Sequence, residues 1–175
     1  MGTHNALLRL SGSSYLEVIA IDADASAPTS ARWFGLDDLA PDDLPRLATW
    51  VLRVDDLDET LAASAEPLGV VVAMSRGPFA WRITVPPGGR PPLDGLLPAL
   101  ISWSTPHPAT SLTARGCRLL ALEARCPEDP DRLDRALRSI DAREIAITEA
   151  MSGAAPRLVA TIQTPAGVRR LDATK

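Results

Sequence analysis

Apolar and polar positions follow strand and helix periods in an order that repeats along the chain. The stretch Ala48–Val54 is an apolar run of strand length, and Asp56 with Glu59 forms an acidic capping box that begins a helix. Pro67 ends the helical pattern. Three more strands are predicted after the helix, at Val70–Met74, Phe79–Val85 and Leu97–Trp103. This part of the chain therefore predicts one β-α-β-β-β unit.

The same order of elements returns some 70 residues later. Arg118–Arg125 has the composition of a strand, and Asp129 followed by Pro130 is a helix cap with proline at the first helical position. Three strands complete the unit, at Glu144–Glu149, Arg157–Thr164 and Val168–Asp172. Two matching β-α-β-β-β units predict an internal repeat.

The chain opens with a hairpin that has no strand or helix before it. Its strands are Ala6–Leu10 and Tyr15–Ile21, joined by the turn-forming residues Ser11–Ser14. By analogy with the repeat, this hairpin ends an earlier unit, and we interpret Met1 as an internal methionine. We divide the chain into a first-unit remnant with its crossover loop (1–45), a second unit (46–112) and a third unit (113–175). The predicted fold class is α+β, with largely antiparallel mixed sheets and helices on their outer faces.

Composition excludes several classes of function. The net charge is −4 and the pI is near 5.2, so no basic surface is expected for nucleic-acid binding. No run of about 18 apolar residues predicts a membrane span, and the N-terminus lacks a signal-peptide pattern. Cys117 and Cys126 have no CxxC spacing and are interpreted as reduced thiols. We therefore expect a cytoplasmic protein that binds a small molecule, and neither nucleic acid nor a membrane.

Several stretches of the chain carry a family resemblance. They are GTHNALLRL, SYLEVIA, RWFGLD, RLATWVLRVDDLD, MSRG with WRIT, and GLLPALISWSTPHPA, and together they cover most of Gly2–Ala109. In these stretches the chain resembles the bacterial glyoxalase-like domain proteins of the vicinal oxygen chelate superfamily, which includes glyoxalase I, bleomycin-resistance proteins and extradiol dioxygenases. The resemblance implies that β-α-β-β-β units pair into a cupped sheet.

The resemblance also implies where metal ligands would lie, on the first and last strands of each unit. Position by position, it places ligands at Glu17, at Thr49 and at Ala99 or Leu100, with a further one on a strand before Met1. Neither Thr49 nor the two apolar residues suit a divalent metal. Glu17 is then the only matching metal-ligand position, so we expect no cofactor and no divalent metal.

Glu17 lies in an otherwise apolar strand, which leaves two readings open. It is either a carboxylate on the solvated face of a sheet, or a catalytic pocket carboxylate that acts as a general base or a residual metal ligand. His4 would share a face with Glu17 if the hairpin pairs symmetrically about Ser11–Ser14, but about four residues would separate the two along it, which is too far for one metal. His107, flanked by prolines, lies either at the rim of the pocket or in a rigid packing loop.

Arginine and tryptophan side chains supply the remaining candidates for a ligand site. If Arg53, Arg76 and Arg82 lie near one concave sheet, they suit a carboxylate or a phosphate through bidentate hydrogen bonds; otherwise they are ordinary polar-face residues. The tryptophans could line an apolar pocket, but core packing is the more economical assumption for so scarce a residue type. The candidate ligand-binding positions are His4, Thr49, Arg53, Ser75, Arg76, Trp81, Arg82, Trp103 and His107.

Three classes of function remain open. The first is binding of a small oxygenated, anionic metabolite in the cupped sheet, with a degenerate metal site. The second is a metal-dependent lyase or isomerase of the glyoxalase type, or a dioxygenase. The third is a non-catalytic sequestration protein of the bleomycin-resistance type. The lost ligand positions favour binding over metal catalysis. Because one edge of the opening hairpin lacks a neighbour, we also expect a homodimer.

Overall fold

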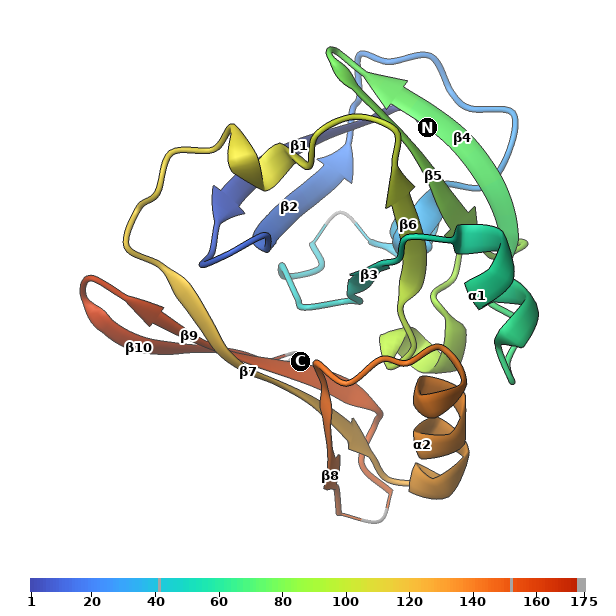
Figure 1. Cartoon of the computed structure of the whole chain (residues 1–175), viewed down its shortest axis with the longest axis vertical. Helices are drawn as coiled ribbons and strands as arrows, with labels where there is room; N and C mark the ends of the chain where they lie inside the picture. Colours follow the sequence, from blue (N-terminus) through green and yellow to red (C-terminus); the bar gives the residue numbers. More distant parts are fainter. Residues whose placement is uncertain (41, 152, 173–175) are drawn as a thin grey trace.

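Three β-sheets, each formed by one contiguous stretch of chain, make up the computed structural model, which describes residues 1–40, 42–151 and 153–172 (Figure 1). The elements in chain order are β1 (Thr3–Arg9), β2 (Tyr15–Ile21), η1 (Trp33–Asp38), β3 (Val51–Arg53), α1 (Leu57–Ala63), β4 (Val70–Arg76), β5 (Phe79–Val85), η2 (Pro92–Gly95), β6 (Ala99–Trp103), η3 (Pro108–Thr110), β7 (Arg118–Cys126), α2 (Pro130–Ser139), β8 (Ala146–Glu149), β9 (Arg157–Thr164) and β10 (Gly167–Asp172). The first sheet is the β1–β2 hairpin. The second has the strand order β3-β6-β5-β4, and the third has the order β10-β9-β7-β8.

The second sheet contains the predicted β-α-β-β-β unit. β3 runs parallel to β6, and β5 runs antiparallel to both β6 and β4. α1 begins at the predicted cap, where Oδ1 of Asp56 accepts a hydrogen bond from the backbone N–H of Glu59 at 2.9 Å. The helix lies on the outer face of the sheet, because Asp58 of α1 forms an ion pair with Arg82 of β5. The α+β class, with mixed, largely antiparallel sheets and outer helices, is confirmed.

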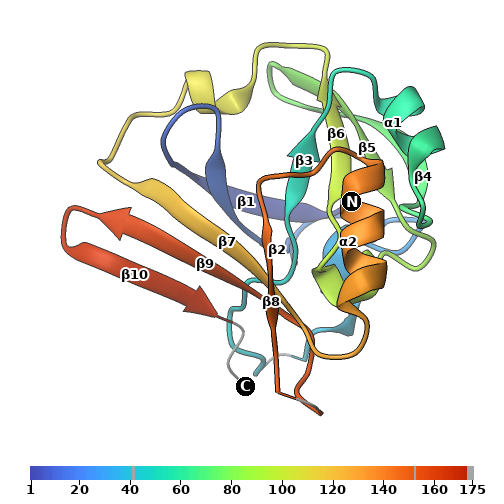
Figure 2. The same ribbon diagram turned by 60° about the horizontal axis from the view of Figure 1, so that its bottom comes forward.

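The third sheet has the same order of elements along the chain but a different strand order. β8, which follows α2, lies parallel to β7 and beside it. Figure 2 shows the other strands of this sheet, β10, β9 and β7, side by side. In the second sheet the strand that follows the helix, β4, lies at the far edge, and the last strand lies beside the first. The predicted repeat therefore holds for the order of elements and not for the topology. Periodicity shows where strands occur, but it does not show which strand pairs with which.

One apolar core joins the second and third sheets. Leu57 of α1 and Leu100 of β6 are buried in the same cluster as Leu133 of α2 and Leu158 of β9. Polar contacts link the helices as well: Ser139 at the end of α2 accepts a hydrogen bond from the chain just after α1 at 2.9 Å. The two helices therefore pack into the same core, close to each other. In the part of the chain that the structure describes, neither helix has the length and apolar content to span a membrane.

The register of the β1–β2 hairpin differs by one residue from the symmetric pairing considered above. Leu7 pairs with Glu17, and His4 pairs with Ala20. Leu10 is buried and takes no part in the strand pairing, so the loop is one residue longer than Ser11–Ser14. A shift of one residue reverses which face a side chain occupies. His4 and Glu17 consequently lie on opposite faces, and the prediction of a shared face was wrong.

Candidate functional site

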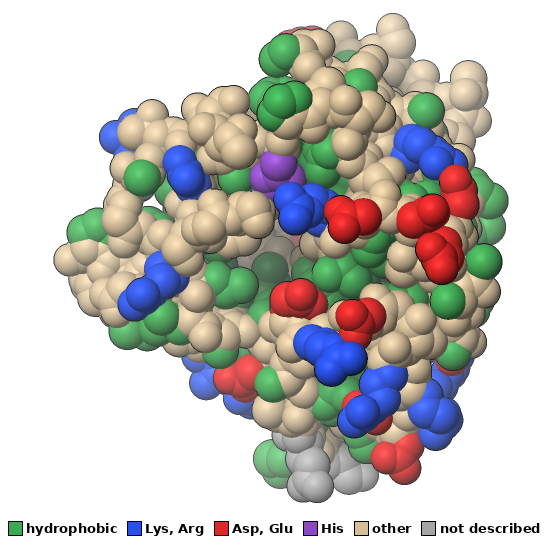
Figure 3. Space-filling view, in the orientation of Figure 1, with side chains coloured by type: hydrophobic (Ala, Val, Ile, Leu, Met, Phe, Trp, Pro, Cys, Tyr) green, Lys and Arg blue, Asp and Glu red, His purple; other side chains and the backbone are tan. Residues whose placement is uncertain are grey.

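A cavity of about 320 Å³ lies between the β1–β2 hairpin and the second sheet. Figure 3 shows a hollow in the middle of the molecular face drawn, with hydrophobic side chains beside it. The walls come from both strands of the hairpin, from η1, from β3, β5 and β6, from the β4–β5 turn and from the start of η3. The lining residues are Asn5, Leu7, Tyr15, Glu17, Trp33, Phe34, Val51, Arg76, Gly77, Pro78, Phe79, Trp81, Ile83, Ile101, Trp103 and Pro108.

Strand alternation decides which side chains of the second sheet face the cavity. Phe79, Trp81 and Ile83 of β5 point to the cavity, as do Ile101 and Trp103 of β6. All of these side chains are apolar apart from the indole N–H. The other polar side chains of the cavity therefore come from the hairpin and from the end of β4.

Glu17 lies on the cavity wall and not on a solvated face. Nδ2 of Asn5 donates a hydrogen bond to Oε1 of Glu17 at 2.6 Å, across diagonal positions of the hairpin. Burial raises the pKa of Glu17, an effect that the Asn5 hydrogen bond and the charge of Arg76 only partly oppose. Burial and the nearby Glu17 charge also raise the pKa of Tyr15 to about 12. The carboxyl group thus lies in a poorly solvated environment beside a phenol that stays protonated.

Arg76 is the cationic side chain of the cavity lining. Its Nη2 donates hydrogen bonds to the backbone oxygen of Thr3 at 3.0 Å and to Thr3 Oγ1 at 3.3 Å. Within the described residues these are its only hydrogen bonds, so Nε and Nη1 keep donors free for a ligand. Ser75, the neighbouring candidate, is exposed and outside the lining.

The other two candidate arginines do not line the cavity. Both terminal nitrogens of Arg82 donate to the carboxylate of Asp58 at 2.8 Å, on the helix side of the sheet. Arg53 is exposed, and its charge contributes to lowering the pKa of His107. The three guanidinium groups therefore do not converge, because Arg82 alternates to the face opposite Trp81.

His107 is not one of the lining residues, but its ring contacts two of them. Its ring centroid is 5.4 Å from that of Tyr15 and 5.6 Å from that of Trp103. Nδ1 of His107 accepts a hydrogen bond from the backbone N–H of Ala109 at 3.3 Å, which caps η3. Burial, followed by the charge of Arg53, lowers the pKa of His107. His4 is exposed and outside the cavity lining.

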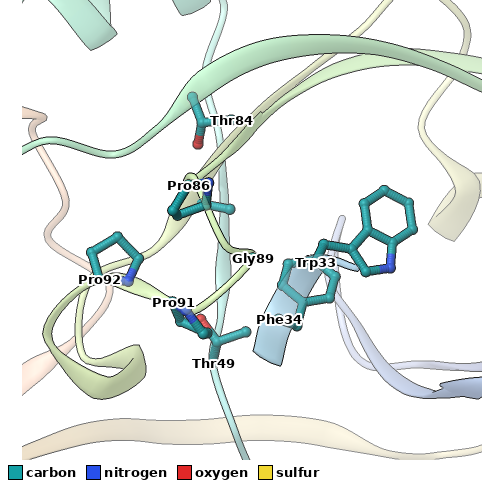
Figure 4. Close-up of a pocket in the computed structure, with 9 residues that line it drawn as sticks. Trp33, Phe34, Thr49, Thr84, Pro86, Gly89, Pro91 and Pro92 are labelled. Atoms are coloured by element: carbon teal, nitrogen blue, oxygen red, sulfur yellow. The ribbon is translucent and has the colours of Figure 1, made fainter. Parts of the chain in front are cut away.

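Thr49 lines a separate, much smaller cleft of about 10 Å³, which has room for about one water molecule. Figure 4 shows Thr49 on one side of this cleft with Pro91, and Trp33 and Phe34 on the other. Trp33 and Phe34 line both spaces, so η1 separates the cleft from the cavity. Thr49 and the cavity therefore do not share a ligand.

The residues at the family's ligand positions do not fit a divalent metal. Glu17 reaches the cavity, but Ala99 lines the small cleft with Thr49, and Leu100 is fully buried in the core on the outer side. Residues 1–40, 42–151 and 153–172 contain no group of three or more His, Cys, Asp or Glu side chains that could hold a metal ion. A single carboxylate among aromatic rings lacks the remaining donors that such an ion requires.

The sequence reasoning missed Asn5 and Tyr15, and it named Trp81 and Trp103 as candidates while treating core packing as the more economical role for the tryptophans. The hydrogen bond from Asn5 to Glu17 depends on the hairpin register, which the sequence pattern did not fix. For the tryptophans a signal was available. Phe79 and Trp81 alternate along one strand in a chain with only 4% aromatic residues, so their rings had to gather on one face.

A cupped sheet built on a β-α-β-β-β unit, with its cavity on the concave side, is the architecture of vicinal oxygen chelate proteins. Residues 1–140 match the family model described as "Glyoxalase-like domain", and the chain therefore belongs to this family. β8, β9 and β10 lie beyond the matched residues. The comparisons with curated proteins and with solved structures gave no match.

Proposed function

We propose that the protein binds a small, oxygenated, anionic metabolite in the cavity between the hairpin and the second sheet. The observation that carries this proposal is the placement of a guanidinium group, on Arg76, and a carboxyl group, on Glu17, on the wall of an otherwise largely apolar cavity. A cavity of about 320 Å³ is at the lower end of the size range for small-molecule sites. Such sites combine apolar walls with a few polar groups that orient the ligand.

The ionic contact of the ligand is with Arg76. The free Nε and Nη1 donors of this guanidinium can take a carboxylate in a bidentate manner. Glu17 shares the cavity, and its raised pKa makes the neutral acid form more accessible beside a second anion. A protonated Glu17 donates a hydrogen bond to a ligand oxygen, whereas an ionised one repels it. We therefore expect binding to strengthen as the pH falls.

The test is calorimetric titration of the protein with carboxylates of two to eight carbons and with inorganic phosphate. Arg76→Gln should weaken carboxylate binding roughly 10- to 100-fold, because hydrogen bonds to charged groups contribute about 1.5–3 kcal/mol. The matched control is Arg143→Gln, which removes an arginine that is exposed and paired with Asp141. Thermal denaturation of each variant checks that it folds. Absence of binding by any of these anions, or equal binding by Arg76→Gln, would refute the proposal.

A second candidate is a metal-free reaction of the glyoxalase type, in which Glu17 removes a proton next to a carbonyl group. It is favoured by the hydrogen bond that holds the Glu17 carboxylate at 2.6 Å from Asn5 in a poorly solvated site. The test is exchange of the methyl protons of pyruvate in deuterated water, followed by NMR. Exchange that is faster with the wild type than with Glu17→Gln supports this candidate, and equal rates exclude it for this substrate.

A further inference from the structure

Aromatic side chains are concentrated at the cavity to a degree that the composition does not explain. The chain has four tryptophans, two phenylalanines and one tyrosine, and six of these seven residues line the cavity. The sixteen lining residues are about a tenth of the chain, so an even spread would place fewer than one aromatic residue there. The core between the second and third sheets is built instead from leucine, isoleucine and alanine.

The exception, Trp50, shows how a tryptophan is used in the core of this fold. Trp50 packs against the leucine-rich core, and its Nε1 donates a hydrogen bond to the backbone oxygen of Leu96 at 2.9 Å. By contrast, Nε1 of Trp33 and Nε1 of Trp103 are buried without a hydrogen-bond partner among the described residues. An unpaired buried N–H is unfavourable for folding, and a leucine at either position would avoid it. Packing alone therefore does not account for the cavity tryptophans.

The backbone at η1 gives an independent observation. Phe34 has φ of 60°, in the left-handed region that a bulky side chain rarely adopts. In this conformation the ring of Phe34 stacks on Trp33, with centroids 5.4 Å apart and planes inclined by 21° (Figure 4). Strained residues of this kind cluster at binding sites, where the surrounding structure maintains them. Here the strain places two stacked rings at the cavity wall.

The sheet supplies the other aromatic rings and fixes where an acid group lies relative to them. Trp81 and Trp103 are tilted by 41° at 5.3 Å, and Phe79 meets Trp103 edge-on at 82°. None of these pairs is stacked face to face. Arg76 and Phe79 are direct cross-strand partners. When Arg76 binds the carboxylate of a ligand, the atoms next to that carboxylate therefore lie against Phe79, and the atoms beyond them lie against Trp81 and Trp103.

We propose that the anion bound in this cavity is an aromatic acid, whose carboxylate contacts Arg76 and whose flat ring lies among Phe79, Trp81 and Trp103 on one side and Phe34 on the other. This inference rests on the function proposed above and adds the substrate class. Aromatic pairs contribute affinity beyond the area they bury, so the site distinguishes an aromatic ring from a saturated ring of similar size.

The experiment compares three probes by calorimetric titration of the full chain: phenylacetate, its saturated counterpart cyclohexylacetate, and the amine phenethylamine. Phenylacetate should bind at least 10-fold more tightly than cyclohexylacetate. In Trp81→Leu this preference should fall below threefold. Trp50→Phe, which changes the aromatic residue outside the cavity, should keep the full preference. Trp103→Leu should lower the preference as well, and it serves as the test if Trp81→Leu does not fold.

The outcomes separate this inference from the function on which it rests. Equal binding of phenylacetate and cyclohexylacetate, both lost in Arg76→Gln, would overturn the aromatic class and leave anion binding in place. Tighter binding of phenethylamine, or no binding of either acid at millimolar concentration, would overturn both proposals. A preference for phenylacetate that persists unchanged in Trp81→Leu and in Trp103→Leu would show that the rings do not select the ligand, and it would overturn this inference alone.

Discussion

Replacing Gly89 with alanine tests how the η1 wall of the cavity is held in position. Gly89 has φ of 74°, and a Cβ added there would overlap the backbone oxygen of Arg32, the residue just before Trp33. The backbone oxygen of Gly89 also accepts a hydrogen bond from the N–H of Gly35 at 2.8 Å. The loop after β5 and η1 therefore touch backbone to backbone, and a methyl group has no room between them.

The magnitude follows from comparison with a glycine that has a similar conformation but open space. Gly12 has φ of 66°, and a Cβ there meets nothing within 4 Å. Gly12→Ala should incur only the cost of the left-handed conformation, about 1–2 kcal/mol. Gly89→Ala adds the cost of displacing packed backbone, about 1–3 kcal/mol. We therefore expect Gly89→Ala to lose about 2–5 kcal/mol, and the middle of this range, about 3 kcal/mol, lowers the Tm of a chain of this size by roughly 6–12 °C.

Urea unfolding followed by tryptophan fluorescence measures both free energies of unfolding, and titration with phenylacetate measures the effect on the cavity. Gly89→Ala should weaken binding as well as stability, because moving η1 displaces Trp33 and Phe34 from the wall. Gly12→Ala should leave the dissociation constant unchanged. Equal losses of stability in the two variants would show that the overlap at Gly89 is relieved without cost, and the reasoning would fail.

Three further changes test the titrating groups and the core. Burial raises the pKa of Glu17 above 4.5, so the stability that the neutral Glu17 side chain contributes is lost as the pH rises through the raised pKa. Glu17→Gln removes this loss and should raise the Tm at about pH 7. Below about pH 4, where Glu17 is neutral, the same variant should not raise the Tm. Burial lowers the pKa of His107 below 6.5, so the wild type loses stability as the pH falls through the lowered pKa. His107→Asn removes the titrating group but keeps a side chain that can cap η3. In a series of Tm values measured at decreasing pH, this variant should lose less stability than the wild type. Leu158→Ala should cost about 2–5 kcal/mol in urea unfolding yet leave phenylacetate affinity unchanged well below the Tm.

The kinds of element were predictable because they depend on local periodicity. The predicted strands Tyr15–Ile21, Phe79–Val85 and Arg157–Thr164 have the same bounds in the structure. The predicted strand Ala48–Val54 was too long, because the strand is Val51–Arg53, flanked by backbone hydrogen bonds that join Trp50 and Val54 to β6. Its beginning instead runs beside η2, where the backbone oxygen of Ala48 approaches Gly95 too closely for any Cβ. An approach between distant segments leaves no trace in the local pattern.

The composition of the site was only partly predictable, because it depends on register and on which face each strand presents. Glu17 was identified from its position in an apolar strand, and Arg76 from its place at a turn. Arg82 was grouped with them although its neighbours alternate against it, and the structure pairs it with Asp58 on the outer face. Asn5 required the observed hairpin register, in which it lies diagonal to Glu17.

The cavity and the third sheet meet through the two faces of one strand. Leu100 of β6 lies in the core that α2 and β9 complete, while its neighbours Ala99 and Ile101 belong to the apolar cluster on the cavity side. Among the residues that the structure describes, those that line the cavity all lie at or before Pro108, and none of them belongs to the third sheet. It acts on the site by holding the outer face of β6, the strand that presents Ile101 and Trp103 to the ligand. Changes in the third sheet should therefore affect how much protein is folded, and changes on the inner face of β6 should affect what the folded protein binds.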